Sequence, residues 1–520
     1  MTAAAATTDD LPGLFAPIVG DANVVTDEAE RRYFSRDIFF WDDVETADLV
    51  VQPHTTEEVA AIVKAAREAG LVIATRGGGM SYTKGYVPVR PGTVLIDMRG
   101  LNRVVEVNAE DHYVIAEAGC TWKSVFEAVA ETGLAVAFDA PYSGVYSTVG
   151  GALSQNVPQG MADILAIEVV RADGSVVRTG SWGRSQDTNP FYRWYGPDLA
   201  GLFMGDTGAF GIKTCAVMRL VKKLPGLAYG SFAFESYEDK AAAMVEIAHS
   251  GVIRDKGVLG LDPFKSAGFA KLGFSEAIAT LAKVAKGKGG LKNSIQMAAT
   301  GRNFMEGVKW SMHITLEAIN DDAAEASMDV VRAICLKRGR EIPNLLPMAM
   351  AANRFFVRGF LGEEGQRWVP TNAMVPLSAA VKTTTAVQKF FDSHRDEMNS
   401  HGMVESYMTT FTNQFFLCEP SFYWFDEVSE LHLRHLDAPT AKKVKDNKPD
   451  PAARAFAQRL RFELRDLFFD LGAVNVQLAK FYRYQDSLAP ETARLMAEMK
   501  NHLDPDGMLS PGNLGFGVDR

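Results

Sequence analysis

Short apolar runs and amphipathic stretches alternate in the first part of the chain. An apolar run at 49–53 precedes the segment Thr56–Ala69, whose apolar residues recur every three to four positions as in a helix that packs on a sheet. Threonines followed by two glutamates predict where this helix starts, and Gly70 predicts where it ends. Because a second apolar run, Leu71–Ala74, follows at once, the pattern predicts a strand–helix–strand unit.

The pattern then extends to about Lys223 as one α+β unit and changes after Leu224-Pro-Gly. It predicts a loose lead-in over 1–45, a first domain over 46–224, a second over 225–470, and a return to the first over 471–520. The predicted strands are 93–97, 104–108, 113–117, 164–171, 229–234, 310–317, 403–418 and 473–480. The predicted helices are 121–131, 237–249, 321–338 and 452–471, and a Lys/Gly-rich loop is predicted at 286–292.

The composition and net charge exclude some classes of protein and disfavour others. The 520 residues include 54 Lys and Arg against 64 Asp and Glu, and 47% are hydrophobic, so disordered and fibrous classes are excluded. The net charge of −10 disfavours a protein dedicated to nucleic acid or to anionic lipid. Four widely spaced cysteines indicate neither a disulfide framework nor a metal site.

No targeting or membrane segment is expected. The first 25 residues lack a basic region followed by an apolar core. The longest uncharged run, 140–162, contains two prolines and four glycines, which is a loop composition and not that of a membrane span. We therefore expect a cytoplasmic protein without a membrane span.

A glycine-rich loop follows the predicted strand 71–74. In Arg76-Gly-Gly-Gly-Met-Ser-Tyr82, glycines can turn successive backbone N–H groups inward and form a nest for a pyrophosphate. A plain tight turn is the alternative. The loop lacks the dinucleotide fingerprint GxGxxG, because Tyr82 stands at its final position, and the chain has no GxxxxGK[ST] phosphate loop.

Two further glycine-bearing segments have the composition of ligand-contacting loops. Ser147–Asn156 is uncharged and rich in small, hydroxyl and amide side chains, so it can lie against a large polar ligand or form a buried crossover. Gly205–Thr214 carries regularly spaced glycines before a strand.

These segments, with the tail Leu503–Gly515, resemble the vanillyl-alcohol oxidase/p-cresol methylhydroxylase family of FAD-dependent oxidoreductases over about 45–225 and 470–516. The resemblance implies an α+β fold, with a two-subdomain FAD module built from both chain ends and an inserted substrate cap of antiparallel sheet plus helices. It also implies FAD as cofactor and no metal. The implied cofactor-binding residues are Arg76, Gly77, Gly78, Gly79, Met80, Ser81, Tyr82, Pro141, Ser147, Thr148, Gly150, Gly151, Ser154, Asn156, Gly160, Gly211, Ile212 and Asn513.

One departure from the family concerns covalent attachment. Many members bind FAD through a histidine of the glycine-rich loop, where this chain has Met80, and a thioether cannot form that link. A link from the cap stays open, with His432 and His435 as candidates by elimination. Their i, i+3 spacing could also suggest a metal, but without a third ligand nearby a solvated helix face is the favoured interpretation.

The resemblance also implies catalytic residues. Tyr482 and Arg483 are similar to the Tyr-Arg pair that holds the phenolate in 4-alkylphenol oxidases, with Tyr82 assisting. A cation and a hydroxyl donor keep such an anion ionised in a partly dry site, although Arg483 could instead form a structural ion pair. Asp163 is the candidate base. The HxGDGNxH-type motif of many D-2-hydroxy-acid dehydrogenases is missing.

Three hypotheses follow. The first is hydride transfer from a para-substituted phenol to FAD, with oxygen or a separate electron acceptor as partner. The second is a dehydrogenase of a 2-hydroxy acid or other alcohol that uses a non-oxygen acceptor. The third is a non-catalytic flavin-binding subunit of a larger complex. A homo-oligomer is compatible with each of them.

Overall fold

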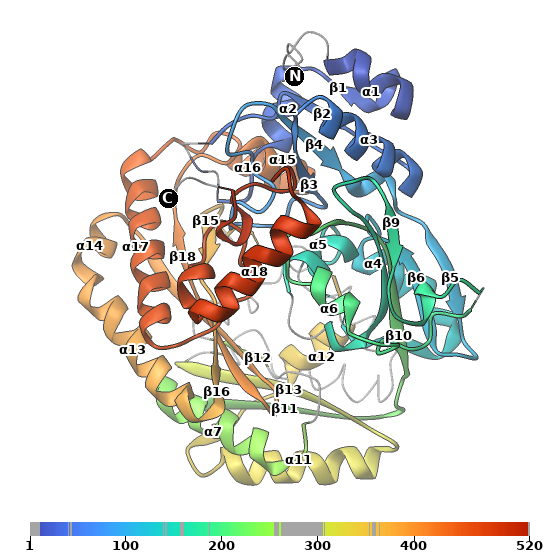
Figure 1. The fold of residues 1–520 in the computed structure, drawn as a ribbon. Helices are drawn as coiled ribbons and strands as arrows, with labels where there is room; N and C mark the ends of the chain where they lie inside the picture. The colour runs from blue at the N-terminus through green and yellow to red at the C-terminus, as the bar shows by residue number, and fades with distance from the viewer. Residues whose placement is uncertain are drawn as a thin grey trace. The chain divides into compact units, whose positions relative to one another are not determined.

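The computed structural model describes residues 11–39, 41, 44–138, 140, 143–156, 161–186, 188–253, 259–261, 305, 307–352, 354–355, 360–362 and 364–517 (Figure 1). The chain divides into two compact units. Unit 1 comprises 1–223, 429–437 and 476–520, and unit 2 comprises 224–428 and 438–475.

The first sheet of unit 1 is formed by the strand–helix–strand unit and its neighbours. Its order is β1 (Val24–Val25), β2 (Leu49–Val51), β4 (Thr93–Asp97) and β3 (Val72–Arg76), and the last three strands are parallel. Helix α3 (Thr56–Glu68) begins at Thr55, whose side chain accepts from the amide of Glu58. The helix buries Val59, Ile62 and Val63 in the core of this sheet, as the sequence pattern predicts.

The second sheet of unit 1 is antiparallel. Its order is β5 (Val104–Asn108), β6 (Tyr113–Glu117), β10 (Ile212–Lys222), β8 (Ile164–Val170) and β9 (Val176–Arg178), with β7 (Leu134–Val136) also paired to β10. The helices of this part are α4 (Trp122–Ala128), α5 (Val149–Ser154) and α6 (Leu199–Phe203).

The C-terminal tail returns to the first sheet. After α18 (Pro490–Leu503), the amide of Ile73 on β3 donates to Met508, and the amide of Ser510 donates back to Ile73, both at 2.8 Å. The tail therefore extends the parallel sheet at the strand that leads into the glycine-rich loop.

Unit 2 is built on an antiparallel sheet with eight strands among its described residues. Figure 1 shows helices α7 (Tyr237–Ser250), α11 (Asp321–Cys335) and α13 (Ala380–Ser393) along one face of it. The strand order is β14 (Gly339–Glu341), β11 (Gly226–Phe234), β13 (Trp310–Ala318), β12 (Leu259–Leu261), β17 (Val404–Phe411), β18 (Phe415–Trp424) and β15 (Arg367–Pro370), with β16 (Ala373–Pro376) on β18. The other helices are α12 (Leu345–Ala352), α14 (Arg395–Ser400), α16 (Ala438–Val444) and α17 (Pro451–Asp470).

The N-terminal part is more ordered than the expected loose lead-in over 1–45. Helix α1 (Leu11–Val19) buries Leu11, Phe15 and Val19 in the core of the first sheet. Helix α2 (Glu28–Phe34) follows, and its N-cap Asp27 accepts from the amide of Glu30. The sequence pattern did not reveal α1, because its run of regularly spaced apolar residues is short and contains Gly13 and Pro17.

Two expected strands are also wrong. The run 403–418 is not one strand but a hairpin, in which β17 and β18 reverse between Phe411 and Phe415. The segment 473–480 forms no strand, because Gln477 and Ala479 have φ values of 56° and 42°, which an extended ladder does not allow. The predicted loop 286–292 lies outside the described residues.

The segment 429–437 differs from the expected continuous second domain over 225–470. It holds the short helix α15 (Glu430–Arg434) and belongs to unit 1, although the chain on both sides of it belongs to unit 2. The four cysteines are buried and unbridged. Within the described part of the chain, no helix is long and apolar enough to cross a bilayer, and no group of three potential ligands could hold a metal ion.

Candidate functional site

The glycine-rich loop leaves the end of β3 with free backbone donors. Among the described residues, no hydrogen bond uses the amides of Gly77, Gly78 or Gly79 as donors. The carbonyls are held instead, because Tyr86 Oη donates to Gly79 O at 3.0 Å and the amide of Ile38 donates to Ser81 O at 3.0 Å. The loop is thus fixed while its glycine N–H groups stay available to a ligand.

Arg76 is a fully buried guanidinium beneath this loop. Its carbon Cζ lies 5.1, 5.1 and 5.4 Å from the ring centroids of Tyr33, Phe34 and Tyr86. Nε and Nη2 have no hydrogen-bond partner among the described residues, and a Cβ added at Gly79 would lie 2.4 Å from Nη2. A buried cation with unsatisfied donors next to open amides is a site for an anion.

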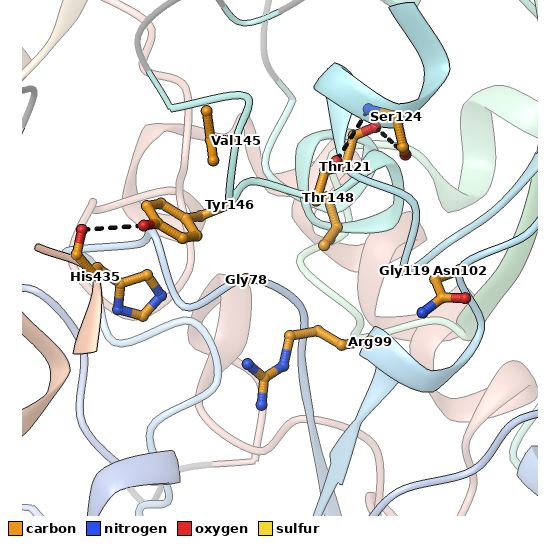
Figure 2. A pocket seen from close by; sticks show the side chains of 10 residues that line it. All are labelled: Gly78, Arg99, Asn102, Gly119, Thr121, Ser124, Val145, Tyr146, Thr148 and His435. Atoms are coloured by element: carbon orange, nitrogen blue, oxygen red, sulfur yellow. Dashed lines mark hydrogen bonds between the residues drawn. The ribbon is translucent and has the colours of Figure 1, made fainter. Parts of the chain in front are cut away.

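Gly78 of this loop also lines a cavity of about 320 Å³ (Figure 2). The backbone bridge between Thr121 and Thr148 brings its walls together. The backbones at Gly78 and Tyr146 lie close together, because a Cβ added at Gly78 would lie 1.8 Å from the carbonyl oxygen of Tyr146. The lining residues are Gly78, Arg99, Asn102, Gly119, Thr121, Ser124, Val145, Tyr146, Thr148 and His435.

His435 comes to this cavity from the segment 429–437. Tyr146 Oη donates to the carbonyl of His435 at 3.1 Å, and the two rings meet edge to face at 4.5 Å (Figure 2). The imidazole Nδ1 lies 2.7 Å from Leu431 O and donates to it. Burial, and then the charges of Arg76 and Arg99, lower the pKa of His435 to about 4, so the ring is neutral at pH 7.

A second polar cluster joins four segments of unit 1. Asn513 Nδ2 donates to Gly85 O at 2.8 Å and to Thr207 O at 2.6 Å. A Cβ added at Gly85 would lie 2.6 Å from Gln155 Nε2. Asn513 Oδ1, Thr207 Oγ1 and Gln155 Oε1 are buried without a partner among the described residues. Such acceptors need donors from a ligand or from water.

Comparisons with known proteins agree on a flavin fold. A family profile described as an FAD binding domain matches residues 47–180. An uncharacterised FAD-linked oxidoreductase of Mycobacterium tuberculosis is 29% identical over 255 residues, which cover 47% of this chain and 53% of the relative. A probable mitochondrial D-lactate dehydrogenase of Danio rerio is 30% identical over 246 residues, covering 46% and 48%. The matched part thus spans about half the length of these curated relatives.

Solved structures match the chain over nearly its whole length. 4-Ethylphenol oxidase from Gulosibacter chungangensis, in complex with isoeugenol, has a TM-score of 0.72 at 18% identity, covering 98% of both chains. p-Cresol methylhydroxylase with substrate bound has a TM-score of 0.70 at 19% identity, also covering 98% of both. Residues 47–180 match an FAD binding domain, and the chain has the fold of these two solved structures, which supports the resemblance to the vanillyl-alcohol oxidase/p-cresol methylhydroxylase family. The solved structures confirm the predicted fold class, and the matched domain confirms FAD as cofactor.

The residues present fit FAD. The open amides of Gly77–Gly79 and the unsatisfied Arg76 suit its pyrophosphate, and the unpartnered acceptors near Asn513 suit the donors of a large polar ligand. The glycines are also required sterically, since a side chain at Gly78 would strike the backbone of Tyr146.

Some of the predicted cofactor residues line the cavity, and others pack the protein around it. Gly78 and Thr148 line the cavity, and Thr148 caps α5 by accepting from Gly151 N at 3.3 Å. Others have packing roles: a Cβ at Gly150 would lie 2.7 Å from that of Ala118, and one at Gly211 would lie 2.4 Å from Val169 Cγ1. Ile212 belongs to the apolar core of the first sheet.

The remaining predicted cofactor residues are also placed by the structure. The carbonyls of Leu153 and Ser154 accept from the amides of Gly205 and Thr207, at 2.8 and 2.9 Å, so the segment 205–214 packs on the end of α5. Asn156 closes that end with a φ of 53°. Ser147 Oγ lies 3.1 Å from Ser143 Oγ, and Met80 is partly exposed in the glycine-rich loop. Pro141 and Gly160 lie outside the described residues.

The predicted catalytic tyrosines lie near one backbone contact. The amide of Lys480 donates to Thr83 O at 3.2 Å, and Lys480 Nζ donates to Lys84 O at 2.8 Å. Tyr82 and Tyr482, which flank this contact, are 4% and 6% exposed. The segment after Leu478 therefore contacts the residues that directly follow the glycine-rich loop.

The two predicted charged residues each have a partner within unit 1. Arg483 Nε donates to Asp486 Oδ2 at 3.2 Å, and both side chains are partly exposed. Asp163 Oδ1 accepts from Arg219 Nε at 2.8 Å and also from its Nη2. Each charge is therefore compensated by the protein itself.

The two histidines of the segment 429–437 are buried, which corrects the favoured interpretation of a solvated helix face. His432 is 1% exposed and His435 is 6% exposed. His432 Nδ1 lies 2.8 Å from Ser429 Oγ and accepts from the Ser429 amide at 3.3 Å, so this ring caps α15. Of the two, the structure brings His435 into the cavity.

Sequence reasoning missed most of the cavity wall. Arg99 and Gly119 follow strands β4 and β6, but neither belongs to a motif. Thr121 and Ser124 could have been found from the sequence. A helix is predicted to start at Thr121, and side chains at a helix start can face a neighbouring loop.

Proposed function

We propose that the protein is an FAD-dependent oxidoreductase that oxidises a para-substituted phenol bound as its phenolate. Bound FAD supplies the hydride acceptor at its N5. The contribution of the chain is to hold the phenolate, keep water away and orient the carbon that loses the hydride. The observation that supports the proposal is the backbone contact between Lys480, two residues before Tyr482, and Thr83, the residue after Tyr82.

The two tyrosines suit the phenolate oxygen. Both side chains are buried, and a charge-assisted hydrogen bond from a tyrosine hydroxyl to an anion is stronger in such surroundings than in water. A phenolate pushes electron density towards its para carbon chain, which favours loss of hydride there. Tyr82 and Tyr482 would therefore both bind the substrate and keep it in its reactive, ionised form.

Arg483 would supply the positive charge. Its pair with Asp486 is partly exposed and spans one turn, and such pairs are weak. An anionic substrate in a drier site can therefore compete with Asp486 for the guanidinium. A bidentate Arg also restricts the plane of the ligand, which a lysine would not do.

Asp163 stays a proposed base, under one condition. Its carboxylate is held by Arg219, so it can accept a substrate proton only if one oxygen remains available. We therefore build the substrate assignment on Tyr82, Tyr482 and Arg483, and treat Asp163 as the weakest member of the set.

A second candidate is the oxidation of a 2-hydroxy acid with transfer of electrons to a non-oxygen acceptor. It is supported by the D-lactate dehydrogenases among the relatives in sequence, whereas the two solved structures named above concern phenols. Arg483 would then bind the carboxylate. We also propose oxygen or a separate electron acceptor as partner, a cytoplasmic location and a homo-oligomer.

The test is anaerobic bleaching of the flavin by matched compounds. Vanillyl alcohol should bleach it, whereas 3,4-dimethoxybenzyl alcohol, which differs by one methyl group and cannot ionise, should not. Bleaching by D-lactate alone would favour the second candidate. A flavin that none of the three compounds reduces would argue for a non-catalytic subunit.

A further inference from the structure

The segment 429–437, called the strap below, is a short piece of chain that leaves unit 2, joins unit 1 and returns. Its helix α15 is one turn long, and one turn is too short to be stable on its own. Its position must therefore come from contacts with the rest of unit 1.

Arg434 makes the first of these contacts, with helix α2. Its Nη1 and Nη2 donate to the two carboxylate oxygens of Glu30 at 2.8 and 2.5 Å. Its Cζ also lies 4.1 Å from the ring centroid of Tyr33, and its Nε donates to Glu430 on the strap itself at 2.7 Å. A bidentate pair stacked on a ring has the geometry in which an exposed ion pair contributes most.

His435 makes the second contact, at the cavity. Its carbonyl is held by Tyr146 Oη and its ring forms part of the cavity wall beside Gly78 (Figure 2). A group bound in the cavity therefore contacts a residue that only the strap supplies.

Helix α2 connects these contacts to the anion site. Tyr33 has Arg434 at 4.1 Å from its ring centroid and Arg76 at 5.1 Å. The same helix thus supports the guanidinium under the glycine-rich loop and the guanidinium that fastens the strap.

We propose that the strap is a clamp that retains FAD: the ion pair of Arg434 with Glu30 fastens it to α2, and His435 closes the cavity over the cofactor. Release of FAD then requires the ion pair to open. This proposal rests on FAD as cofactor and not on the substrate class, so it can fail or hold independently of the proposed reaction.

Release of FAD from the holoenzyme tests the clamp. Purified holoprotein is diluted into flavin-free buffer and the rise in free FAD fluorescence is followed for wild type, Glu30→Gln, Arg434→Met and the double variant. We expect roughly threefold to tenfold faster release in both single variants, and no further increase in the double variant, since each change removes the same pair. Release from wild type should also accelerate with salt, and release from the variants should not.

Glu430→Gln is the matched control, because it removes the other carboxylate from Arg434 but leaves the contact with α2. Its release rate should stay within about twofold of wild type. The exchange Glu30→Arg with Arg434→Glu should restore slow release if the pair itself matters.

Three results would overturn the clamp. They are equal release rates in all variants, a drop in the melting temperature of the flavin-free variants without a change in release, and flavin that stays with wild-type protein after acid precipitation. In the last case a covalent bond, not the ion pair, would retain the cofactor.

Discussion

The side chain of Asn513, close to the C-terminus, donates a hydrogen bond of 2.8 Å to the carbonyl of Gly85, just after the glycine-rich loop. The same amide nitrogen donates to Thr207 at 2.6 Å. One buried side chain thus joins three segments that are more than 100 residues apart in sequence. The FAD module depends on such hydrogen bonds between segments that are distant in sequence.

Asn513→Ala should destabilise unit 1 by about 1–3 kcal/mol, because it leaves the buried carbonyl of Thr207 without its donor, whereas Gly85 O keeps Lys480 Nζ at 3.2 Å. Chemical denaturation followed by fluorescence measures the change. Asn399→Ala, at an exposed position of α14, is the control and should change stability by less than about 0.5 kcal/mol. Equal stability of the two variants would show that Asn513 does not hold the loops together.

Gly78→Ala should lower the FAD content of the purified protein sharply. The new methyl group would lie 1.8 Å from the carbonyl oxygen of Tyr146, so the loop must move away from the cavity. Absorbance at flavin wavelengths per mole of protein measures the content. Gly13→Ala is the matched control, since nothing lies within 4 Å of its Cβ, and it should keep full FAD content. A yellow Gly78→Ala protein would disprove the steric argument.

His313 should make unit 2 sensitive to acid. Its ring lies 2.9 Å from both Ser231 Oγ and Ser311 Oγ, and burial, helped by the charge of Lys240, lowers its pKa to about 3. Because the unfolded state takes up a proton near pH 6.5 and the folded state does not, stability is lost as the pH falls from 6.5 towards 3. The loss from one such group is at most about 1.4 kcal/mol per pH unit.

The variant His313→Asn tests whether His313 causes this loss of stability at low pH. It should be less stable than wild type at pH 7, and the difference in unfolding free energy should shrink as the pH falls to 4. A difference that stays constant as the pH falls would contradict the assignment of a neutral buried ring.

Local patterns predicted much of this fold because they were strong and contiguous. Strands β4, β5 and β6 have the predicted limits, and helices α3, α7 and α17 lie within one or two residues of theirs. The three glycine-bearing segments and the tail were found because glycine spacing is visible in sequence.

The remaining parts depend on contacts that no local pattern encodes. The strap looks like any polar helix start in the sequence, and its membership in unit 1 follows from Glu30 and Tyr146, which are far away along the chain. The partner of Asp163 is Arg219 on β10, and no motif relates the two. The expected strand 473–480 does not form because Gln477 and Ala479 have positive φ values, and Lys480 contacts Thr83, which is far away along the chain.

The proposed phenolate site is tested most directly by the rate at which vanillyl alcohol bleaches the flavin without oxygen, in wild type and in Arg483→Met. The loss of a charge-assisted contact to the anion should slow bleaching roughly 10- to 100-fold, while FAD stays bound. Arg494→Met, which removes an exposed arginine of α18, should bleach at the wild-type rate. Equal rates in Arg483→Met and wild type would contradict the proposed site.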